Sequence, residues 1–367
     1  MKYLVGFLLV TFFILSACNK DEEETDEVFD REAMLKNYSE NLVVPSYEEA
    51  LSSLNTLKTA VDEFSNDPSS SSLENLQTTW LSSFKDWQYA SVYNFGPAAE
   101  QGLNKSLNEE IATFPVDASK INDIISTGEY NLQDFNRDSR GFLAIEYLIF
   151  GGITVSNSEV LDFFSNQNNR MDYLIACTDQ IAGKVENALN SWNNGYSSQF
   201  INNNGTDAGS STSQLYNEFV KSFETIKNLK VELPLGLRPG QTQAEPQLVQ
   251  AYYSGHSLAV LKEHIQAIEN TYFGKNRAGT KGESFKDYLE SVVGGPELID
   301  ETISQWDVVI AALEAIPVDT PISEQITNNP QPYKDFGEEL QRHTRFFKSD
   351  MSSRLGIAIT YSSGDGD

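Results

Sequence analysis

Glu146 is the residue whose setting in this sequence points most directly to chemistry. It is the single carboxylate in an otherwise apolar run from Gly141 to Gly152. A helix that is apolar on all sides is buried, and a buried carboxylate is costly unless it is paired, hydrogen-bonded, bound to a cation or protonated. Without a cation or an arginine beside it, its pKa should be raised. The run is too short to cross a bilayer, so it predicts a buried core helix.

Histidines, the usual partners of a carboxylate in a metal site, are few in this chain. They are His256, His264 and His343. His256 and His264 are too far apart in sequence for an i, i+4 chelate. Glu339 and His343 have that spacing, but on so acidic a chain a surface salt bridge between them is the favoured interpretation. No His-Glu-x-x-His pattern, Gly-x-Ser-x-Gly motif or phosphate-binding glycine loop is present. The sequence therefore does not favour an enzyme.

Helical periodicity dominates the segments that must position these residues. Apolar residues recur at helical spacing in both halves of the chain, and no long period-two run flanked by tight turns is present. A stretch rich in Asn, Gly and Ser at 193–213 separates the halves. The sequence thus predicts an all-α fold of two helical, four-helix-type bundles packed together, at residues 45–200 and 201–367.

Several short motifs, in their order along the chain, resemble the imelysin family of bacterial proteins. They are Trp80 with Phe95-Gly96-Pro97-Ala98, the central Gly141-to-Glu146 run, Tyr253-Ser254-Gly255 before a helix, and Leu355-Gly356-Ile357 with a terminal Gly-Asp-Gly-Asp. The resemblance covers about residues 40–367. It implies two helical bundles in a periplasmic or surface protein. Members were first described as metallopeptidases and are now more often linked to iron or haem uptake.

The resemblance also implies a metal site, from which this chain departs. The family signature on the central helix is Gly-x-His-x-x-Glu. Gly141 and Glu146 match it, but Leu143 stands at the histidine position. Positions three apart share a helical face, so a histidine there would share a cation with Glu146, whereas leucine cannot. Gln250 stands where relatives tend to carry glutamate. Glu146 is therefore left as the one expected ligand for iron or another divalent cation.

The N-terminal sequence predicts that the protein is located at the cell envelope. A short basic start precedes an apolar stretch of signal-peptide length at residues 4–15. Leu15-Ser16-Ala17-Cys18 resembles the lipobox of bacterial lipoproteins, which implies a signal peptide at 1–18 and a lipid anchor in the outer membrane at Cys18. Lys20, followed by acidic residues, resembles the surface-export signal of Bacteroidetes lipoproteins. A protein facing the periplasm is the alternative. Residues 19–44 are predicted to form an acidic tether.

Charge and composition narrow the choice of partners. The 367 residues include 26 basic and 53 acidic side chains, a formal charge of −27, which argues against nucleic acid because its phosphates are also negative. In the first hypothesis, an inter-bundle cleft binds iron, haem or another ligand for uptake-system proteins, with Glu146, Tyr253, Ser254 and His256 lining it. In the second, the chain is a structural or interaction protein in which Glu146 satisfies buried donors. The third is a metallopeptidase.

Overall fold

The computed structural model describes residues 29–101 and 105–361. The predicted signal peptide, Cys18, the first part of the tether and the terminal Gly-Asp-Gly-Asp lie outside these residues. Within them the chain is helical and contains no strand, and an isolated β-bridge joins Lys275 to Lys281. The predicted all-α class is therefore confirmed. None of the helices in the described ranges combines the length and the hydrophobicity of a membrane span.

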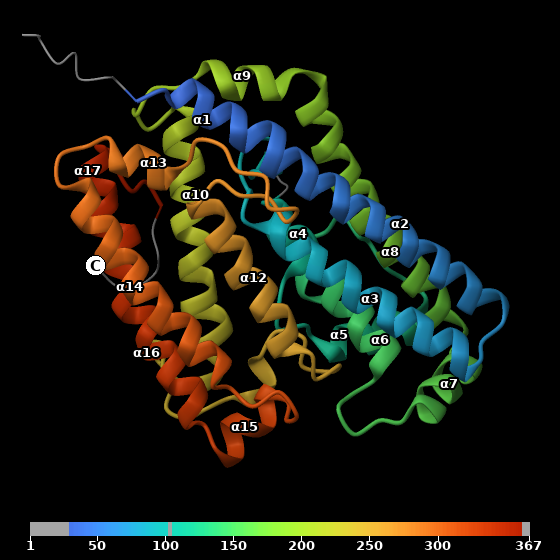
Figure 1. Ribbon diagram of the computed structural model, residues 1–367. Coiled ribbons are helices and arrows are strands. Elements are labelled where there is room, and N and C mark those ends of the chain that lie inside the picture. The colour runs from blue at the N-terminus through green and yellow to red at the C-terminus, as the bar shows by residue number, and fades with distance from the viewer. Residues whose placement is uncertain (1–28, 102–104, 362–367) are drawn as a thin grey trace, which may run out of the picture.

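The first half of the chain is built on three long helices that lie side by side (Figure 1). They are α2 (Val44–Asn66), α3 (Ser70–Ser91) and α8 (Asn168–Ser191). The shorter elements of this half are α1 (Arg31–Asn37), η1 (Tyr38–Val43), η2 (Gly96–Ala98), α4 (Leu107–Ala112), α5 (Ala118–Thr127), η3 (Arg137–Ser139), α6 (Phe142–Phe150), α7 (Asn157–Asn166), η4 (Trp192–Tyr196) and α9 (Ser197–Asn202).

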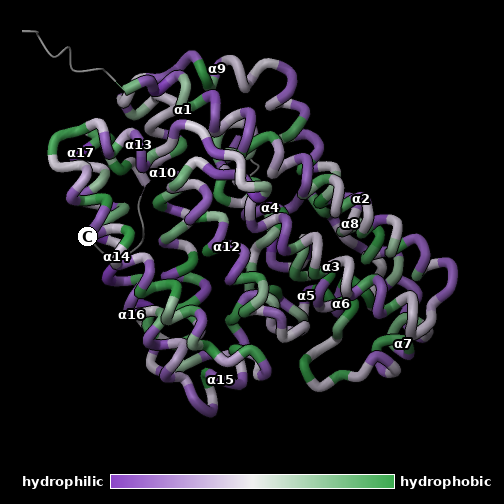
Figure 2. Tube along the Cα trace, in the orientation of Figure 1, coloured by the Kyte–Doolittle hydropathy of each residue, from purple (hydrophilic) through white to green (hydrophobic). Residues whose placement is uncertain are grey.

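The second half contains four long helices, of which α14 (Gly295–Glu314) and α16 (Gln331–Arg345) pack against each other far from α2 and α3 (Figure 1). The other two are α10 (Ser211–Thr225) and α12 (Ser257–Tyr272). The shorter elements are η5 (Ile226–Glu232), α11 (Leu233–Leu235), η6 (Pro246–Leu248), α13 (Phe285–Glu290), α15 (Ile322–Asn328), η7 (Phe346–Met351) and α17 (Ser352–Leu355). Hydrophobic and hydrophilic residues are interleaved along the long helices (Figure 2), as expected for helices with one buried face.

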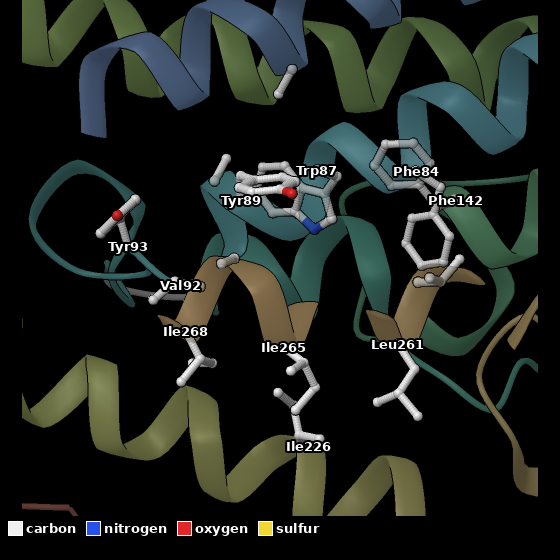
Figure 3. Close-up of a cluster of buried hydrophobic side chains, with 14 of the residues drawn as sticks. Phe84, Trp87, Tyr89, Val92, Tyr93, Phe142, Ile226, Leu261, Ile265 and Ile268 are labelled. Carbon is white, nitrogen blue, oxygen red and sulfur yellow. The ribbon is translucent and has the colours of Figure 1, made fainter. Parts of the chain in front are cut away.

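Helix α12 joins the two halves. It packs against α3 on one side and against α10 and the π-helical segment η5 on the other. In Figure 3, Ile265 of α12 points toward Ile226 of η5 and Leu261 points to the same side, while Phe84 and Trp87 of α3 lie on the opposite side. All five side chains are buried. The two halves therefore share one continuous hydrophobic core.

Residues 31–44, predicted as part of the acidic tether, are helical instead. Met34, Leu35 and Tyr38 are fully buried, and the Tyr38 hydroxyl donates to the carbonyl oxygen of Thr271 at 2.5 Å. Because these apolar side chains gain free energy by leaving water, they hold α1 and η1 against the second half of the chain. Residues 31–44 therefore belong to the folded chain.

Candidate functional site

Helix α6 is the buried central helix that the sequence predicts. Gly141 precedes it with a φ of 81°, a conformation that favours glycine, and a Cβ at this position would collide with the carbonyl oxygen of Ile111. The indole nitrogen of Trp80, on α3, donates to the carbonyl oxygen of Phe142 at 2.9 Å. These two contacts fix the start of α6 and thereby the direction in which Glu146 points.

Glu146 connects the two halves of the protein through Ser254. Its Oε1 atom accepts hydrogen bonds from the Ser254 backbone N–H at 2.7 Å and from the Ser254 hydroxyl at 2.6 Å. Ser254 belongs to the segment 250–256 that leads into α12, and in this segment Ala251 has a φ of 56°. Such strained residues persist where the surrounding structure fixes them, often at functional sites. The structure thus brings together Glu146 and Ser254, two of the predicted site residues.

No cation pairs with Glu146 among the described residues. Arg140, the nearby arginine in the sequence, instead forms ion pairs with Glu110 at 2.8 Å and Asp134 at 3.2 Å. Only 1% of Glu146 is exposed. Burial raises the pKa of Glu146 from 4.5 to about 7, against the opposing effect of its hydrogen bonds with Ser254. This is the direction that the sequence predicts for a carboxylate buried without a cation.

Tyr253 and His256 lie beside this contact. The Tyr253 ring meets that of Tyr147 with centroids 4.9 Å apart. The His256 backbone N–H donates to the Ser254 hydroxyl oxygen at 3.3 Å, while its imidazole packs against the Phe150 ring, with centroids 6.2 Å apart. Tyr253 and His256 therefore contribute ring packing and a backbone hydrogen bond around Ser254.

This arrangement does not fit the metal site that the family resemblance implies. Leu143 and Glu146 line a cavity of only about 20 Å³, which has room for about one water molecule. Nowhere in 29–101 or 105–361 does a group of three His, Cys, Asp or Glu side chains lie close enough to hold a metal ion. Glu146 is instead a hydrogen-bond acceptor that ties α6 to the segment before α12.

A larger cavity, of about 340 Å³, lies between the halves. Its wall is formed by the end of α3, the chain around α4, the facing side of α10 and η5, and α12. Gln250, the second position at which this chain departs from the family pattern, lies in this wall. The volume falls at the lower end of the range typical of small-molecule sites.

Polar side chains that are almost wholly buried line this larger cavity. Lys230, on η5, is 5% exposed, and its Nζ atom donates to Gln88 Oε1 at 2.8 Å. The Nε2 atom of His264, on α12, lies 2.7 Å from the Ser222 hydroxyl oxygen. Burial lowers the pKa of Lys230 and of His264 well below their ordinary values, and the positive charge of Lys230 adds to the effect on His264. The wall thus holds two basic groups that have lost most of their hydration.

Four buried polar atoms of residues in this wall have no hydrogen-bond partner within the described part of the chain. They are Trp87 Nε1, Asn108 Oδ1, Gln250 Oε1 and His264 Nδ1. Folded proteins leave few buried polar atoms unpaired, and each such atom calls for an explanation. These atoms belong to residues that line one and the same cavity.

The burial of Lys230 was not predicted from the sequence, although the spacing of its neighbours indicates it. Phe219, Phe223, Ile226 and Lys230 follow helical spacing, and the first three are fully buried. A lysine that continues an apolar helical face is drawn into the interior with its neighbours. The helical spacing of Trp80, Phe84 and Trp87 predicts that Trp87 is a core residue. It is buried as predicted, and it also lines the larger cavity.

The predicted surface salt bridge between Glu339 and His343 is wrong. His343 is fully buried, with its ring against those of Trp306 and Phe347 at centroid distances of 5.0 and 4.4 Å. Glu339 pairs with Arg342 instead. The i, i+4 spacing places the two side chains on neighbouring parts of the helix surface, but the aromatic residues of the second half hold the imidazole in the core.

Comparisons with known proteins identify one matching protein family and solved structures with a similar fold. The family model of imelysin, peptidase family M75, matches residues 43–340. A solved structure of a protein described as an iron-regulated protein A precursor, from Parabacteroides distasonis, is similar with 19% identity and a TM-score of 0.72, over 89% of this chain and 95% of that chain. An imelysin-like protein from Psychrobacter arcticum is similar with 17% identity and a TM-score of 0.70, over 90% and 97% of the two chains. No curated protein matches. Since the family model covers most of its length, this chain belongs to the imelysin family.

Proposed function

We propose that this protein is a non-catalytic binding protein that holds a small organic ligand in the larger cavity between its two halves. The observation that carries the proposal is the wall of that cavity, where Lys230, Gln250 and His264 are nearly buried. Leaving a buried polar atom unpaired costs about 1–3 kcal/mol. A ligand that supplies partners to Gln250 Oε1 and His264 Nδ1 removes this cost, and the gain favours the bound state.

The proposal concerns an organic ligand rather than a bare metal ion. Glu146 has no second metal ligand beside it among the described residues, since Leu143 replaces the family's histidine. The cavity volume of about 340 Å³ favours a molecule smaller than haem. One structural neighbour is described as iron-regulated, which supports a role in nutrient uptake, with the ligand passed on to uptake-system proteins.

We further propose that the protein is held in the outer membrane by a lipid on Cys18. The lipobox-like sequence Leu15-Ser16-Ala17-Cys18 and the basic and apolar residues before it support this location. Lys20 and the acidic residues after it support the outer surface of the membrane. The acidic tether would then separate the lipid from the folded chain, whose first described helix begins at Arg31.

The proposal is tested by filling the cavity. Thr225 lines it, and its hydroxyl bonds only the backbone of its own helix, at Lys221. Thr225→Trp therefore adds bulk to the cavity without breaking a contact between helices. Thr78→Trp is the matched control, because the Thr78 hydroxyl makes the same kind of bond, to Glu74, on an exposed face of α3.

Each protein is incubated with the small-molecule fraction of spent growth medium, dialysed and examined by native mass spectrometry. The wild type and Thr78→Trp should retain one small molecule per chain, and Thr225→Trp should not. If the wild type retains nothing, or if Thr225→Trp retains the same molecule equally well, the proposal is wrong. The wild type retaining nothing is the result expected of a purely structural or interaction protein.

A further inference from the structure

We infer that the ligand of the larger cavity carries a carboxylate, which binds the Lys230 ammonium group and the Trp87 indole N–H. The inference rests on the proposed function, because it assumes that the cavity binds a small molecule. It adds the chemical class of that molecule, a small organic acid with a compact apolar body. The supporting observations are the charge balance of the wall, the kind of hydrogen-bonding atoms left over, and the apolar surface beside them.

The charges around the cavity leave Lys230 without a counter-charge. Lys221 lines the same cavity but pairs with Glu218 at 3.1 Å, and Glu109 is exposed to solvent. Within the described part of the chain, no carboxylate forms an ion pair with Lys230, whose polar contact is the neutral oxygen of Gln88. A buried charge without a partner is unfavourable by several kcal/mol, which is why the pKa of Lys230 is lowered. An anion bound at this position would stabilise the ammonium form of the lysine.

The Lys230 amino group is held in place with hydrogen-bonding capacity to spare. Gln88 Nε2 donates to the Phe84 carbonyl oxygen at 2.9 Å, which turns Gln88 Oε1 toward Lys230. The Tyr333 hydroxyl donates to the backbone carbonyl oxygen of Lys230 at 2.6 Å, which fixes the main chain at this residue. An ammonium group has three donors, and one of them is used by Gln88. The lysine lies on a π-helical segment, a backbone form found frequently at functional sites.

Trp87 supplies a second donor to the same cavity. It directly precedes Gln88 on α3, and its indole nitrogen is buried without a partner among the described residues. An indole N–H can only donate, and so can an ammonium group, whereas an ionised carboxylate can only accept. A carboxylate therefore matches both donors of the wall, and a cationic ligand or a metal ion would be repelled by Lys230.

The rest of the wall indicates what kind of group is attached to the carboxylate. Ala112, Phe114 and Leu229 add apolar surface to the cavity, and the ring of Trp87 adds a flat aromatic face. Burying such surface against an apolar group is favourable in proportion to its area. A monocarboxylate with a short apolar or aromatic body matches the two donors and the apolar surface, while the acceptor oxygens Asn108 Oδ1 and Gln250 Oε1 require a hydrogen-bond donor, such as a hydroxyl group, on that body.

The inference is tested with two pairs of probes that differ in charge but hardly in shape. Benzoate and benzamide form the aromatic pair, and hexanoate and hexanamide form the aliphatic pair. Their affinities are measured by isothermal titration calorimetry on the wild type, Lys230→Met and Lys221→Met. Methionine fills the space of the lysine without its charge, and replacing a buried charge by an apolar side chain of similar volume does not destabilise a protein as a rule. Lys221→Met removes a lysine of the same cavity that already has a counter-charge.

The wild type should bind at least one acid about ten- to hundredfold more tightly than the matching amide, as expected of a charge-assisted hydrogen bond. Lys230→Met should lose this preference, and Lys221→Met should largely keep it. Trp87→Phe, which retains the ring and removes the N–H, should weaken binding of the acid more than binding of the amide.

Three results would overturn the inference. They are equal binding of acid and amide by the wild type, an unchanged preference in Lys230→Met, and no binding of either acid. None of them affects the proposed function, which depends on whether Thr225→Trp loses the molecule retained in the mass-spectrometry experiment. A retained molecule that is electrically neutral would support the function and overturn the carboxylate.

Discussion

Replacing Glu146 by glutamine should change how the stability of the protein depends on pH. The side chain is almost fully buried, and both hydrogen bonds from Ser254 reach the same oxygen, Oε1. Glutamine has nearly the same shape as glutamate and keeps an oxygen that can accept both bonds. The substitution therefore removes the ionisation of the group while retaining most of its contact with Ser254.

The sign and size of the effect follow from the two pKa values of Glu146. Burial raises the pKa of Glu146 from 4.5 to about 7 in the folded protein. Between these values the folded state holds a proton that the unfolded chain has released, so stability falls as pH rises. The contribution is fully present below pH 4.5 and is lost by about pH 7. The difference between the two pKa values corresponds to about 3 kcal/mol.

The assay is urea denaturation of the wild type and of Glu146→Gln at several pH values between 4.5 and about 8. The other titrating groups are common to both proteins, so the difference between the two free energies of unfolding isolates Glu146. It should shift in favour of the variant by about 3 kcal/mol across this range. Glu74→Gln, at an exposed position of α3, should follow the wild type. Parallel curves for wild type and Glu146→Gln would refute the reasoning, because the buried carboxylate would then titrate as it does in the unfolded chain.

Three further predictions concern the buried charges and the metal. Burial alone raises the pKa of Glu110, but hydrogen bonds from Arg137 and Arg140 lower it to about 2, so its stabilisation is present above pH 4.5 and lost as pH falls toward 2. Glu110→Gln should therefore lose about 3–5 kcal/mol in urea denaturation at neutral pH, and a neutral effect would show that the arginines find other partners. Burial lowers the pKa of His343 from 6.5 to about 3, so the folded state resists protonation and stability falls as pH drops between these values. His343→Phe should raise the melting temperature at mildly acidic pH, and no change there would contradict an unpaired imidazole. Elemental mass spectrometry of protein purified without chelator should find no stoichiometric iron. If it found one iron per chain, and this iron were lost in Glu146→Gln, Glu146 would be shown to bind a metal ion.

The sequence predicts the fold well where periodicity is local. The long helices follow from apolar residues three and four apart, and the burial of Glu146 follows from the apolar residues around it. The beginning of the folded chain is missed, because Met34, Leu35 and Tyr38 follow a strongly acidic stretch that indicates a tether. Their burial depends on contacts with residues such as Thr271, more than two hundred positions later.

The larger cavity cannot be predicted from the sequence either, because it depends on contacts between residues far apart in the chain. Gln88 and Lys230, which meet in its wall, are 142 residues apart in the chain, and no local pattern encodes that meeting. The resemblance to the family directs attention to Leu143 and Glu146, where the structure has room for about one water molecule. Only the packing of α3, η5 and α12 shows that Gln250, the other altered position, belongs to the wall of a different and larger cavity.

Glu146 and the larger cavity are nevertheless linked through the segment of chain before α12. Ser254, which Glu146 holds, and Gln250, which lines the cavity, belong to the same short segment before α12, and that segment contains the strained Ala251. Glu146 therefore acts as a positioning residue for one part of the cavity wall. On this basis Glu146→Gln, which keeps the acceptor oxygen, should still retain the small molecule in native mass spectrometry, whereas Glu146→Leu, which removes it, should weaken retention. If Glu146→Gln alone abolished retention, the carboxylate itself would contact the ligand, and the site would have to be moved from the larger cavity to α6.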